Sequence, residues 1–427
     1  MSSDQPGSNL PSFEEAAALV AAHAAKLARI RLAMERVVLG QALGRVLGRP
    51  LRADDDQPAF ARSTRDGFAC RAAEASAYAQ LAIAGTTRAG QTPSGPLPRG
   101  AAWEIMTGAP VPRGADAVAM LEHVEAAGGR IRLLPSRTLK SGDNIVARGA
   151  HARKGNELLA PGSIVGPAQV ALAATCGFAA MDVYVRPRVA ILATGDELVA
   201  IKSAPGPGQI RNSNAPMLAA MVKAAGGVPW VLPIVRDTNE ALNAAISKAA
   251  EADLLLITGG VSAGKFDLVE PALLRAGARF HFTGVLIQPG KPAVFGERPA
   301  KKTPAGKGRR TQYFLGLPGN PVSSAVTFLL FASPVLAALA GRTEFGPRFA
   351  LARLSADVTA KPGLTRFLPA ACSFAGPLPE VQLVSWQGSG DIAAMARANC
   401  FMVVPDEPKR AQKTHLKAGA IVRILLP

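Results

Sequence analysis

Residues 253–264 read DLLLITGGVSAG, an apolar run that ends abruptly at two adjacent glycines. A short run of Leu and Ile bounded in this way is typical of a buried strand. Similar runs alternate with helix-patterned segments along the chain, with strands expected at 189–193, 229–235 and 313–317 and helices at 215–225, 237–250, 267–275 and from 321 onward. This alternation predicts right-handed βαβ crossovers and a parallel sheet covered on both faces, in an α/β domain over residues 186–341.

Toward the N-terminus the pattern changes twice. Ser12 and Glu15 match the S-x-x-E capping box ahead of an Ala-rich periodic run, which predicts a helix over residues 12–30. Helical periodicity continues at 39–47 and returns at 162–175, whereas the sequence between has short apolar runs punctuated by Gly, Pro and Asp. We therefore expect an extended helical linker domain, interrupted by an inserted β-rich domain; the linker would span 1–57 and 149–185, and the insert 58–148.

After residue 341 the chain reads as strands and turns, which predicts a C-terminal β domain at 342–427. The most apolar segment, 322–339, contains serines, a threonine and a proline, so a buried helix explains it better than a membrane span. The N-terminus has no basic stretch followed by an apolar one, and we expect no secretory signal. The four cysteines lack C-x-x-C spacing, which favours reduced thiols in a cytoplasmic protein.

The formal net charge is +17. A positive surface favours anionic partners such as nucleic acid, acidic membrane or small phosphorylated substrates, although surplus arginine can equally keep an Ala-rich protein soluble. The densest basic cluster, at 301–310, lies among Gly, Pro and Thr and is typical of a loop. The sequence has neither a basic stripe with interleaved aromatics nor a spanning segment, so we expect no nucleic-acid partner and no membrane partner.

In an open parallel sheet, ligands bind outside the carboxyl ends of the strands. The segment ATGDE at 193–197 stands at such an end, where Gly195 permits a tight turn. Asp196 and Glu197 place two carboxylates there, which could hold a divalent metal or transfer a proton. Ordinary helix capping is an equal explanation for Asp196. Asp237, in the segment Arg236-Asp237-Thr238, opens a helix after another strand.

Three further turns carry candidate binding groups. TGGVSAG at 258–264 offers free backbone N–H groups at the mouth of a helix, an anion-binding concavity that lacks the P-loop spacing. Asp267 could face the same cleft or simply cap the helix. LPGNPVS at 317–323 forms a rigid strand-to-helix junction. QPGKP at 288–292 holds Lys291 on a stiff turn, where it could contact an oxyanion or point into solvent.

The inserted domain contains two turns with reactive side chains. Asp66 lies in STRDGFA at 63–69, and Thr107 lies in MTGAPVP at 106–112. Their local sequence alone does not distinguish them from ordinary loop residues.

Together these segments resemble the molybdopterin molybdotransferase family, the MoeA-type enzymes related to the E domain of gephyrin. MTGAPVP, ATGDEL, TGGVSAGKFD, PGKP, LGLPGNPVSSAVTF and QGSGD (387–391) occur in family order. The resemblance covers nearly the whole chain from about residue 11. Any one motif can mislead, but this many in register make chance a poor explanation.

The resemblance implies four domains: an elongated helical part, an inserted β domain, an α/β domain of the molybdopterin-binding type and a C-terminal β barrel. It also implies a homodimer whose cleft combines the α/β domain of one subunit with the inserted domain of the other. The family takes adenylylated molybdopterin and molybdate, uses Mg²⁺, and releases AMP as molybdenum joins the dithiolene. Molybdopterin adenylyltransferase and molybdoenzyme targets are further implied partners.

The resemblance also assigns roles residue by residue. The catalytic set would be Asp66, Thr107, Glu197, Asp237 and Asp267, of which the last three would hold Mg²⁺. The substrate-binding set would be Thr194, Gly195, Asp196, Gly259, Gly260, Ser262, Pro289, Lys291, Pro318, Gly319, Asn320, Pro321, Ser323, Arg366 and Ser389. In that set the glycine-rich turns would cradle the nucleotide, and the molybdate pocket would use Lys291, Ser323, Arg366 and Ser389.

The chain departs from the family pattern at several places. Where the family has R-G-E-D, this chain has Ala150-His151 in place of the acidic pair. The segment that matches the family's D-T-N turn reads Asn212-Ser213-Asn214. Gln288 replaces the first lysine of K-P-G-K, and Arg65 replaces the methionine of S-M-D-G. Loss of a metal-binding or proton-transferring carboxylate can reduce a rate by roughly 10²–10⁴. A weakly active or inactive paralogue that binds and delivers the cofactor is therefore a second hypothesis. The third, adenylyl transfer to molybdopterin, is disfavoured by the multi-domain length and by MTGAPVP.

Overall fold

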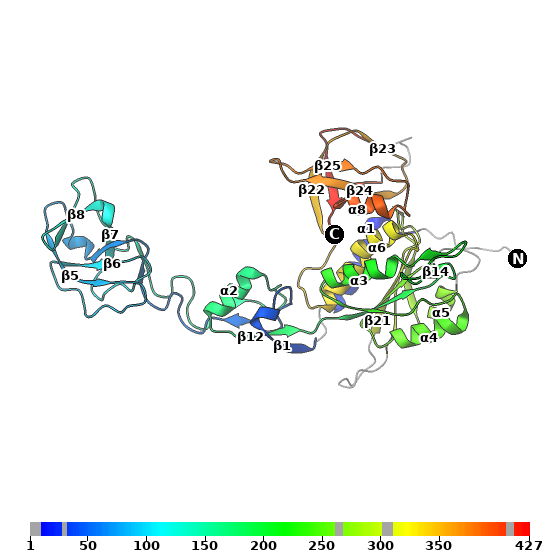
Figure 1. Ribbon diagram of the computed structural model, residues 1–427, viewed down its shortest axis with the longest axis horizontal. Coiled ribbons are helices and arrows are strands. Elements are labelled where there is room, and N and C mark those ends of the chain that lie inside the picture. Colours follow the sequence, from blue (N-terminus) through cyan, green and yellow to red (C-terminus); the bar gives the residue numbers. More distant parts are fainter. Residues whose placement is uncertain (1–9, 28–31, 261–267, 301–310, 407–413) are drawn as a thin grey trace.

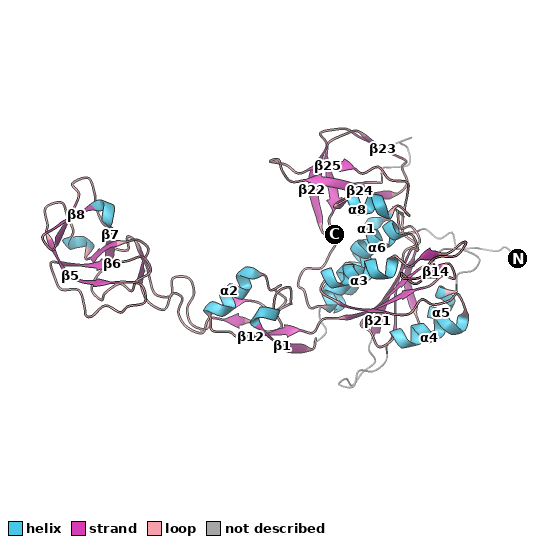
Figure 2. Cartoon of the chain, viewed as in Figure 1, coloured by secondary structure: helices cyan, strands magenta, loops and turns pink. Residues whose placement is uncertain are grey.

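The computed structural model describes residues 10–27, 32–260, 268–300, 311–406 and 414–427. The chain is elongated, with a β-rich lobe at one end, a slender arm in the middle, and an α/β body joined to a second β-rich lobe at the other end (Figure 1). The order of strands and helices along the chain agrees with an α/β domain that follows an inserted β domain and precedes a C-terminal β domain (Figure 2). The residue limits given above for the four domains remain predictions.

The α/β body is built on a six-stranded sheet. Its order is β16 (Val228–Val231), β13 (Arg188–Ala193), β17 (Leu254–Thr258), β21 (Thr311–Leu317), β20 (Val294–Pro299) and β18 (Arg279–Thr283). The first four strands are parallel, whereas β20 and β18 are antiparallel to their neighbours. The predicted parallel sheet is therefore present in four strands, and two antiparallel strands extend it at one edge. The connection between β18 and β20 is too short for the crossover that a parallel pair requires.

Alternating residues of the central strands enter two different cores, because successive side chains of a strand point to opposite faces. Ile191 and Leu256 pack in one core with α1 (Phe13–Leu27), α3 (Asn214–Ala224) and the helices after β21. Leu192 and Leu255 pack in the other with α4 (Asn239–Ala249) and α5 (Val269–Arg275). The sheet is thus covered on both faces, as its apolar strands predicted.

Helix α1 belongs to this body rather than to the arm, because its buried face lies in the same core as the sheet. It begins with the predicted capping box. The Glu15 N–H donates to the Ser12 hydroxyl over 3.1 Å, and the Ser12 N–H donates to the Glu15 carboxylate over 2.8 Å.

The long apolar segment is a core helix. It consists of α6 (Pro321–Thr327), a π-helical turn η4 (Phe328–Ala332) and α7 (Ser333–Leu339). By length and composition the stretch Pro321–Leu339 could cross a membrane, but 89% of its most apolar window is buried inside the fold. Pro334 has no N–H to donate back along the helix, which accounts for the widened turn just before it.

The arm is made of paired short strands and one helix. Its elements are β1 (Met34–Val38) paired with β12 (Ala180–Tyr184), β2 (Leu51–Arg52) paired with β11 (Glu157–Leu159), and α2 (Pro167–Thr175). The helix expected at residues 39–47, all of which the structure describes, is reduced to the 3-10 turn η1 (Leu39–Gln41). Gly44, with φ +74°, is incompatible with continued helix.

The inserted lobe is a six-stranded, mostly antiparallel sheet in the order β7-β4-β6-β5-β9-β8. Its strands are β4 (Gly67–Cys70), β5 (Leu81–Thr87), β6 (Ala101–Ile105), β7 (Ala117–Met120), β8 (Val124–Ala127) and β9 (Arg130–Leu133). The 3-10 turns η2 (Ala72–Glu74) and η3 (Leu121–His123) join them. The chain enters and leaves the lobe through β3 (Arg62–Ser63) and β10 (Ile145–Val146), which pair with each other.

The C-terminal lobe contains the expected barrel. Five strands form a closed ring, because β24 pairs with both β25 and β26. They are β22 (Phe349–Leu354), β24 (Thr365–Ser373), β25 (Glu380–Leu383), β26 (Cys400–Val404) and β28 (Ile421–Leu425). The pair β23 (Val358–Ala360) and β27 (Thr414–Leu416) and helix α8 (Ile392–Arg397) complete the lobe. Strand β19 (Ile287–Gln288) of the body pairs with β24 and ties the two parts together.

Candidate functional site

A cleft of about 690 Å³ lies at the carboxyl ends of β13, β17 and β21. Turns that are far apart in the sequence meet there, together with the start of α3 and the loop before α8. The lining residues are Thr194, Glu197, Leu198, Ile210, Arg211, Asn212, Ser213, Asn214, Thr258, Gly259, Gly260, Pro292, Pro318, Gly319, Asn320, Pro321, Gly390 and Ile392. The ATGDE, TGG and LPGNP segments thus meet in one cleft, as the sequence predicted.

Two adjacent glycines, Gly259 and Gly260, line the cleft at the end of β17. Gly259 has φ +88°, and a Cβ added to it would lie 2.3 Å from the Thr194 carbonyl oxygen. A Cβ on Gly260 would lie 2.8 Å from Cγ2 of Val269. Only glycine allows the β17 turn to pass this close to β13, and the lack of side chains leaves peptide groups facing the cleft.

Asn214 lines the cleft, although its sequence pattern does not mark it as a candidate site residue. Its side-chain N–H groups donate to the Thr258 hydroxyl over 2.8 Å and to the Gly319 carbonyl over 2.6 Å, so it holds two of the cleft turns together. Its Oδ1 is buried and has no hydrogen-bond partner among the described residues. The one sequence signal for Asn214 is its place at the end of Asn212-Ser213-Asn214, the turn that departs from the family pattern.

Three carboxylates, those of Asp196, Glu197 and Asp237, lie near the carboxyl end of β13. The Thr194 hydroxyl donates a hydrogen bond to the Asp237 carboxylate, and the Asp237 N–H lies 3.4 Å from Oδ1 of Asp196. The Glu197 carboxylate folds back over Gly195, where an added Cβ would lie 2.3 Å from Oε2. None of the three carboxylates forms an ion pair with a residue in the described ranges, so oxygen donors of the kind that Mg²⁺ prefers remain available.

Asp237 lies directly before the helix that the sequence predicts it to open, but it does not cap that helix. Thr238 is the N-cap of α4, and its hydroxyl accepts from the Ala241 N–H over 3.3 Å. The Asp237 side chain is therefore turned toward the strand end rather than into the helix.

The C-terminal lobe contributes one edge of the cleft through the QGSGD loop. The Asn320 side-chain amide donates to the Ser389 hydroxyl over 2.8 Å, and the Val322 N–H donates to the Ser389 carbonyl over 3.1 Å. Asp391 accepts from the Ala394 N–H over 2.9 Å and from the Gln387 N–H over 3.0 Å. These backbone N–H groups hold the pKa of the Asp391 carboxyl below its usual range.

The residues expected to bind molybdate lie beside the cleft rather than in its lining. Gln288 and Arg366 are register partners in the β19–β24 pair, so the QPGKP turn and β24 are adjacent. The Arg366 guanidinium donates to the Lys361 carbonyl over 3.1 Å and 2.9 Å, and burial lowers its pKa. Lys291 is exposed, Pro289 is buried after a cis peptide bond, and Ser323 is 4% exposed.

Asp66 and Thr107 form a site of their own on the inserted lobe. Oδ1 of Asp66 accepts from the Thr107 N–H over 2.7 Å and from its hydroxyl over 2.8 Å. These two bonds lower the pKa of the Asp66 carboxyl. The lobe lies at the opposite end of the chain from the body (Figure 1), so this pair does not reach the cleft of its own subunit.

The remaining residues of interest lie in several different parts of the chain. Ser262 and Asp267 lie outside the described residues. Arg211, which the sequence reading did not single out, is the only cationic residue among the described lining residues. Asn212 lies in the cleft, whereas His151 is exposed on the arm.

Three family models match the chain in order. They are the MoeA N-terminal region (domain I and II) at residues 11–177, the probable molybdopterin binding domain at 190–338, and the MoeA C-terminal region (domain IV) at 351–426. A molybdopterin molybdenumtransferase of Bacillus subtilis is 34% identical over 92% of this chain and 89% of its own length. One from Nostoc sp. is 33% identical over 92% and 88%. A crystal structure of the molybdopterin biosynthesis protein MoeA from Pyrococcus horikoshii superposes with a TM-score of 0.78 at 27% identity, over 98% of this chain and 100% of that one.

Proposed function

The chain belongs to the MoeA family of molybdopterin molybdenumtransferases, and on that premise we propose that it transfers molybdenum to adenylylated molybdopterin with release of AMP. The observation that carries the proposal is the single cleft in which the ATGDE, TGG, LPGNP and QGSGD segments meet. Likeness to the named relatives extends over nine-tenths of the chain, which favours this activity over adenylyl transfer.

The cleft is suited to an anionic nucleotide-linked substrate. Peptide groups at Gly259 and Gly260 can approach phosphate oxygens without side-chain obstruction, and Arg211 adds a positive charge. The unpartnered Oδ1 of Asn214 can accept a hydrogen bond from the substrate. Lys291, on the QPGKP turn, and Arg366, on the adjacent strand β24, would bind the molybdate substrate beside the cleft.

Glu197 and Asp237 would hold Mg²⁺, joined by Asp267 as the family resemblance implies. The ion would supply charge neutralisation at the pyrophosphate. Within the protein, the Thr194 hydroxyl orients the Asp237 carboxylate, and the Gly195 turn brings Glu197 over the same strand end. Glu197 is thus positioned by the tight turn after β13, and Asp237 by the turn before α4.

A homodimer would complete the site. Asp66 and Thr107 lie too far from the cleft of their own subunit to act there, but the inserted lobe of a second subunit could deliver them. All four thiols are free, which supports a reducing, cytoplasmic location.

The test is AMP release from adenylylated molybdopterin by the full-length protein. We expect release to require both molybdate and Mg²⁺, and Glu197→Gln to lower the rate by roughly 10²–10⁴ because a charged ligand is lost from the cleft. Glu380→Gln, an exposed substitution on β25, is the control and should leave the rate unchanged. Folded wild-type protein that binds the substrate but releases no AMP above the buffer rate would reject the transfer reaction and support the delivery hypothesis.

A further inference from the structure

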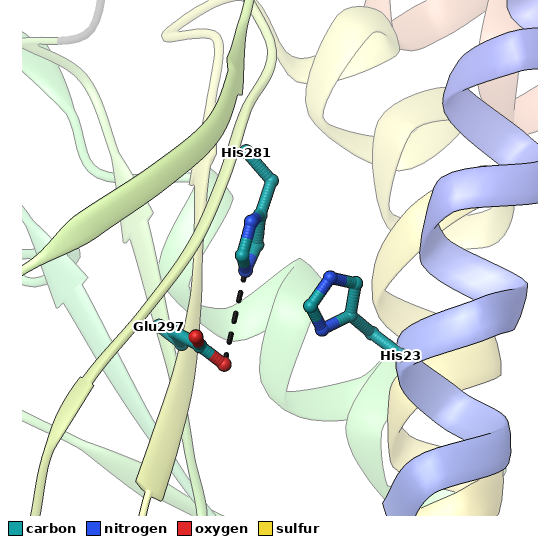
Figure 3. Close-up of side chains that lie close together, drawn as sticks. All are labelled: His23, His281 and Glu297. Atoms are coloured by element: carbon teal, nitrogen blue, oxygen red, sulfur yellow. Dashed lines mark ion pairs between the residues drawn. The ribbon is translucent and has the colours of Figure 1, made fainter.

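Two histidines and a glutamate gather between α1 and the edge of the sheet, away from the cleft. His23 is on α1, His281 on β18 and Glu297 on β20 (Figure 3). One potential ligand atom from each residue lies within 4.8 Å of the other two. The His281 and Glu297 side chains are 7% and 25% exposed, and His23 is 7% exposed, so the group is largely shielded from water.

One buried polar atom of this group has no hydrogen-bond partner among the residues that the structure describes. Nδ1 of His23 lies 3.1 Å from the Tyr313 hydroxyl, which leaves Nε2 as its second ring nitrogen. Nε2 of His281 lies 3.8 Å from the Glu297 carboxylate, beyond hydrogen-bonding distance. That nitrogen is buried and has no hydrogen-bond partner among the described residues. A buried polar atom without a partner needs a reason, and a bound ligand is one.

The chemistry of the donors selects a class of ligand. A neutral imidazole has one ring nitrogen whose lone pair is available for coordination, and each histidine of the group can supply one such atom. Two imidazoles and one carboxylate suit Zn²⁺ or a similar transition metal, whereas Mg²⁺ and Ca²⁺ prefer oxygen alone. This donor set therefore differs in kind from the all-carboxylate group in the cleft.

The ligand atoms lie farther apart than in a metal-bound site, and the side chains must move to coordinate an ion. Ligands at roughly 2.0–2.1 Å from a tetrahedral zinc are about 3.4 Å apart, so the 3.8 Å between His281 and Glu297 closes with a small side-chain rotation. The two imidazole rings, whose centroids are 4.0 Å apart and tilted by 37°, must open further. Lys26 and Arg279 add nearby positive charge, which lowers the affinity for a cation.

We propose that His23, His281 and Glu297 form a binding site for a divalent transition metal, with Zn²⁺ the best match, that fastens α1 to the edge of the sheet. The Tyr313 hydroxyl or a water would occupy a remaining position. The bound ion would act on stability rather than on the reaction, because none of the three residues lines the cleft.

The experiment is a titration of the chelator-treated, full-length protein with Co²⁺ as a spectroscopic substitute for Zn²⁺, followed by competition with Zn²⁺. Wild type should bind one equivalent at this site with a tetrahedral cobalt absorption band, and Zn²⁺ should displace it and raise the melting temperature. His281→Gln and Glu297→Gln should each weaken binding by on the order of a hundredfold. His415→Gln, an exposed histidine on β27, is the matched control and should change neither binding nor melting temperature.

The variants must keep a cooperative thermal transition without metal, so that lost binding is not mistaken for unfolding. A wild-type titration without saturable tetrahedral binding would overturn the proposal. So would tight binding that survives both the His281 and the Glu297 substitution, because the metal would then occupy other ligands. Neither result bears on AMP release, so the two proposals fail independently.

Discussion

A substitution at Gly259 would test the close packing of the β17 turn against the end of β13. Alanine there would bring a Cβ to 2.3 Å from the Thr194 carbonyl oxygen while adopting φ +88°. We expect Gly259→Ala to lower the free energy of unfolding by about 1–3 kcal/mol through strain, as measured by urea denaturation. The turn would also move away from β13, and substrate binding should weaken.

The control is Gly419→Ala, at φ +86° with no atom within 4 Å of an added Cβ. Gly419→Ala should lower the free energy of unfolding by about 1–2 kcal/mol, because it imposes the left-handed backbone conformation on alanine without a clash. Equal destabilisation by the two substitutions would show that the contact with Thr194 is unimportant.

Among single residues, the sequence predicted those cleft-lining residues that lie directly after strands. Thr194, Glu197, Gly259, Gly260 and Pro318 follow apolar runs, and all of them line one cleft. Asn214 could not be identified in this way, because its role depends on Thr258 and Gly319, which are remote in sequence. Asp66 and Thr107 were found only by resemblance to the family.

Helix α4 ends against two buried polar side chains rather than in solvent. The Gln312 amide donates to the carbonyls of Ala249 and Ala252 over 2.7 Å and 2.8 Å. Arg298 donates to Gln312 over 2.8 Å and to the Ile246 carbonyl over 2.7 Å. Burial lowers the pKa of Arg298 to about 10, so it remains charged at neutral pH and favourably placed near the helix C-terminus.

We expect Gln312→Leu to lower the free energy of unfolding by about 2–3 kcal/mol, because it leaves buried carbonyls and an arginine N–H without partners. Chemical denaturation at neutral pH measures the effect. Arg275→Gln, which removes exposed contacts to Asn239 and Asn243 on the same helix, should cost less than about 0.5 kcal/mol. A Gln312→Leu protein as stable as wild type would mean that water satisfies these groups.

Asp391 is the N-cap of helix α8, and its contribution to stability should depend on pH. Because the folded-state pKa of Asp391 is lowered, its contribution is fully present above the unfolded value of 3.8 and is lost as pH falls through the folded value. Asp391→Ala should therefore destabilise the C-terminal lobe at neutral pH, and the difference from wild type should shrink in acid. Thermal melts at several pH values test this, and a difference that stays constant down to acid pH would contradict it.

At the scale of elements, periodicity predicted the parallel strands and the helices around them but not the two antiparallel strands. Strand β20 carries Gly296, Glu297, Arg298 and Pro299, which do not form an apolar run. Its position is fixed by pairing with β21, a long-range contact that no local pattern reports. Residues 39–47 were misread as helix because their Leu and Val spacing outweighed the two glycines.

For the whole molecule, the separation of Asp66 from the cleft predicts complementation between subunits. Asp66→Asn and Glu197→Gln proteins should each be nearly inactive, because every proposed site then lacks one residue. After the two are unfolded together and refolded, half of the dimers are mixed and contain one intact site. AMP release should then recover to roughly one quarter of the wild-type rate.

Mixing without refolding provides the control, since subunits that have not exchanged should stay inactive. Recovery absent from a refolded, dimeric mixture would mean that Asp66 serves its own subunit or none. A monomeric protein with full activity would contradict the shared site directly.

The pairing of β3 with β10 places the entry and the exit of the inserted lobe side by side. A module whose two ends meet can be gained or lost without rerouting the chain on either side. The same closure makes residues 62–146 a natural unit to excise, to express separately, or to exchange for the corresponding piece of a relative. Exchange of this unit between relatives would alter the inserted lobe and leave the connections of the arm and the body unchanged.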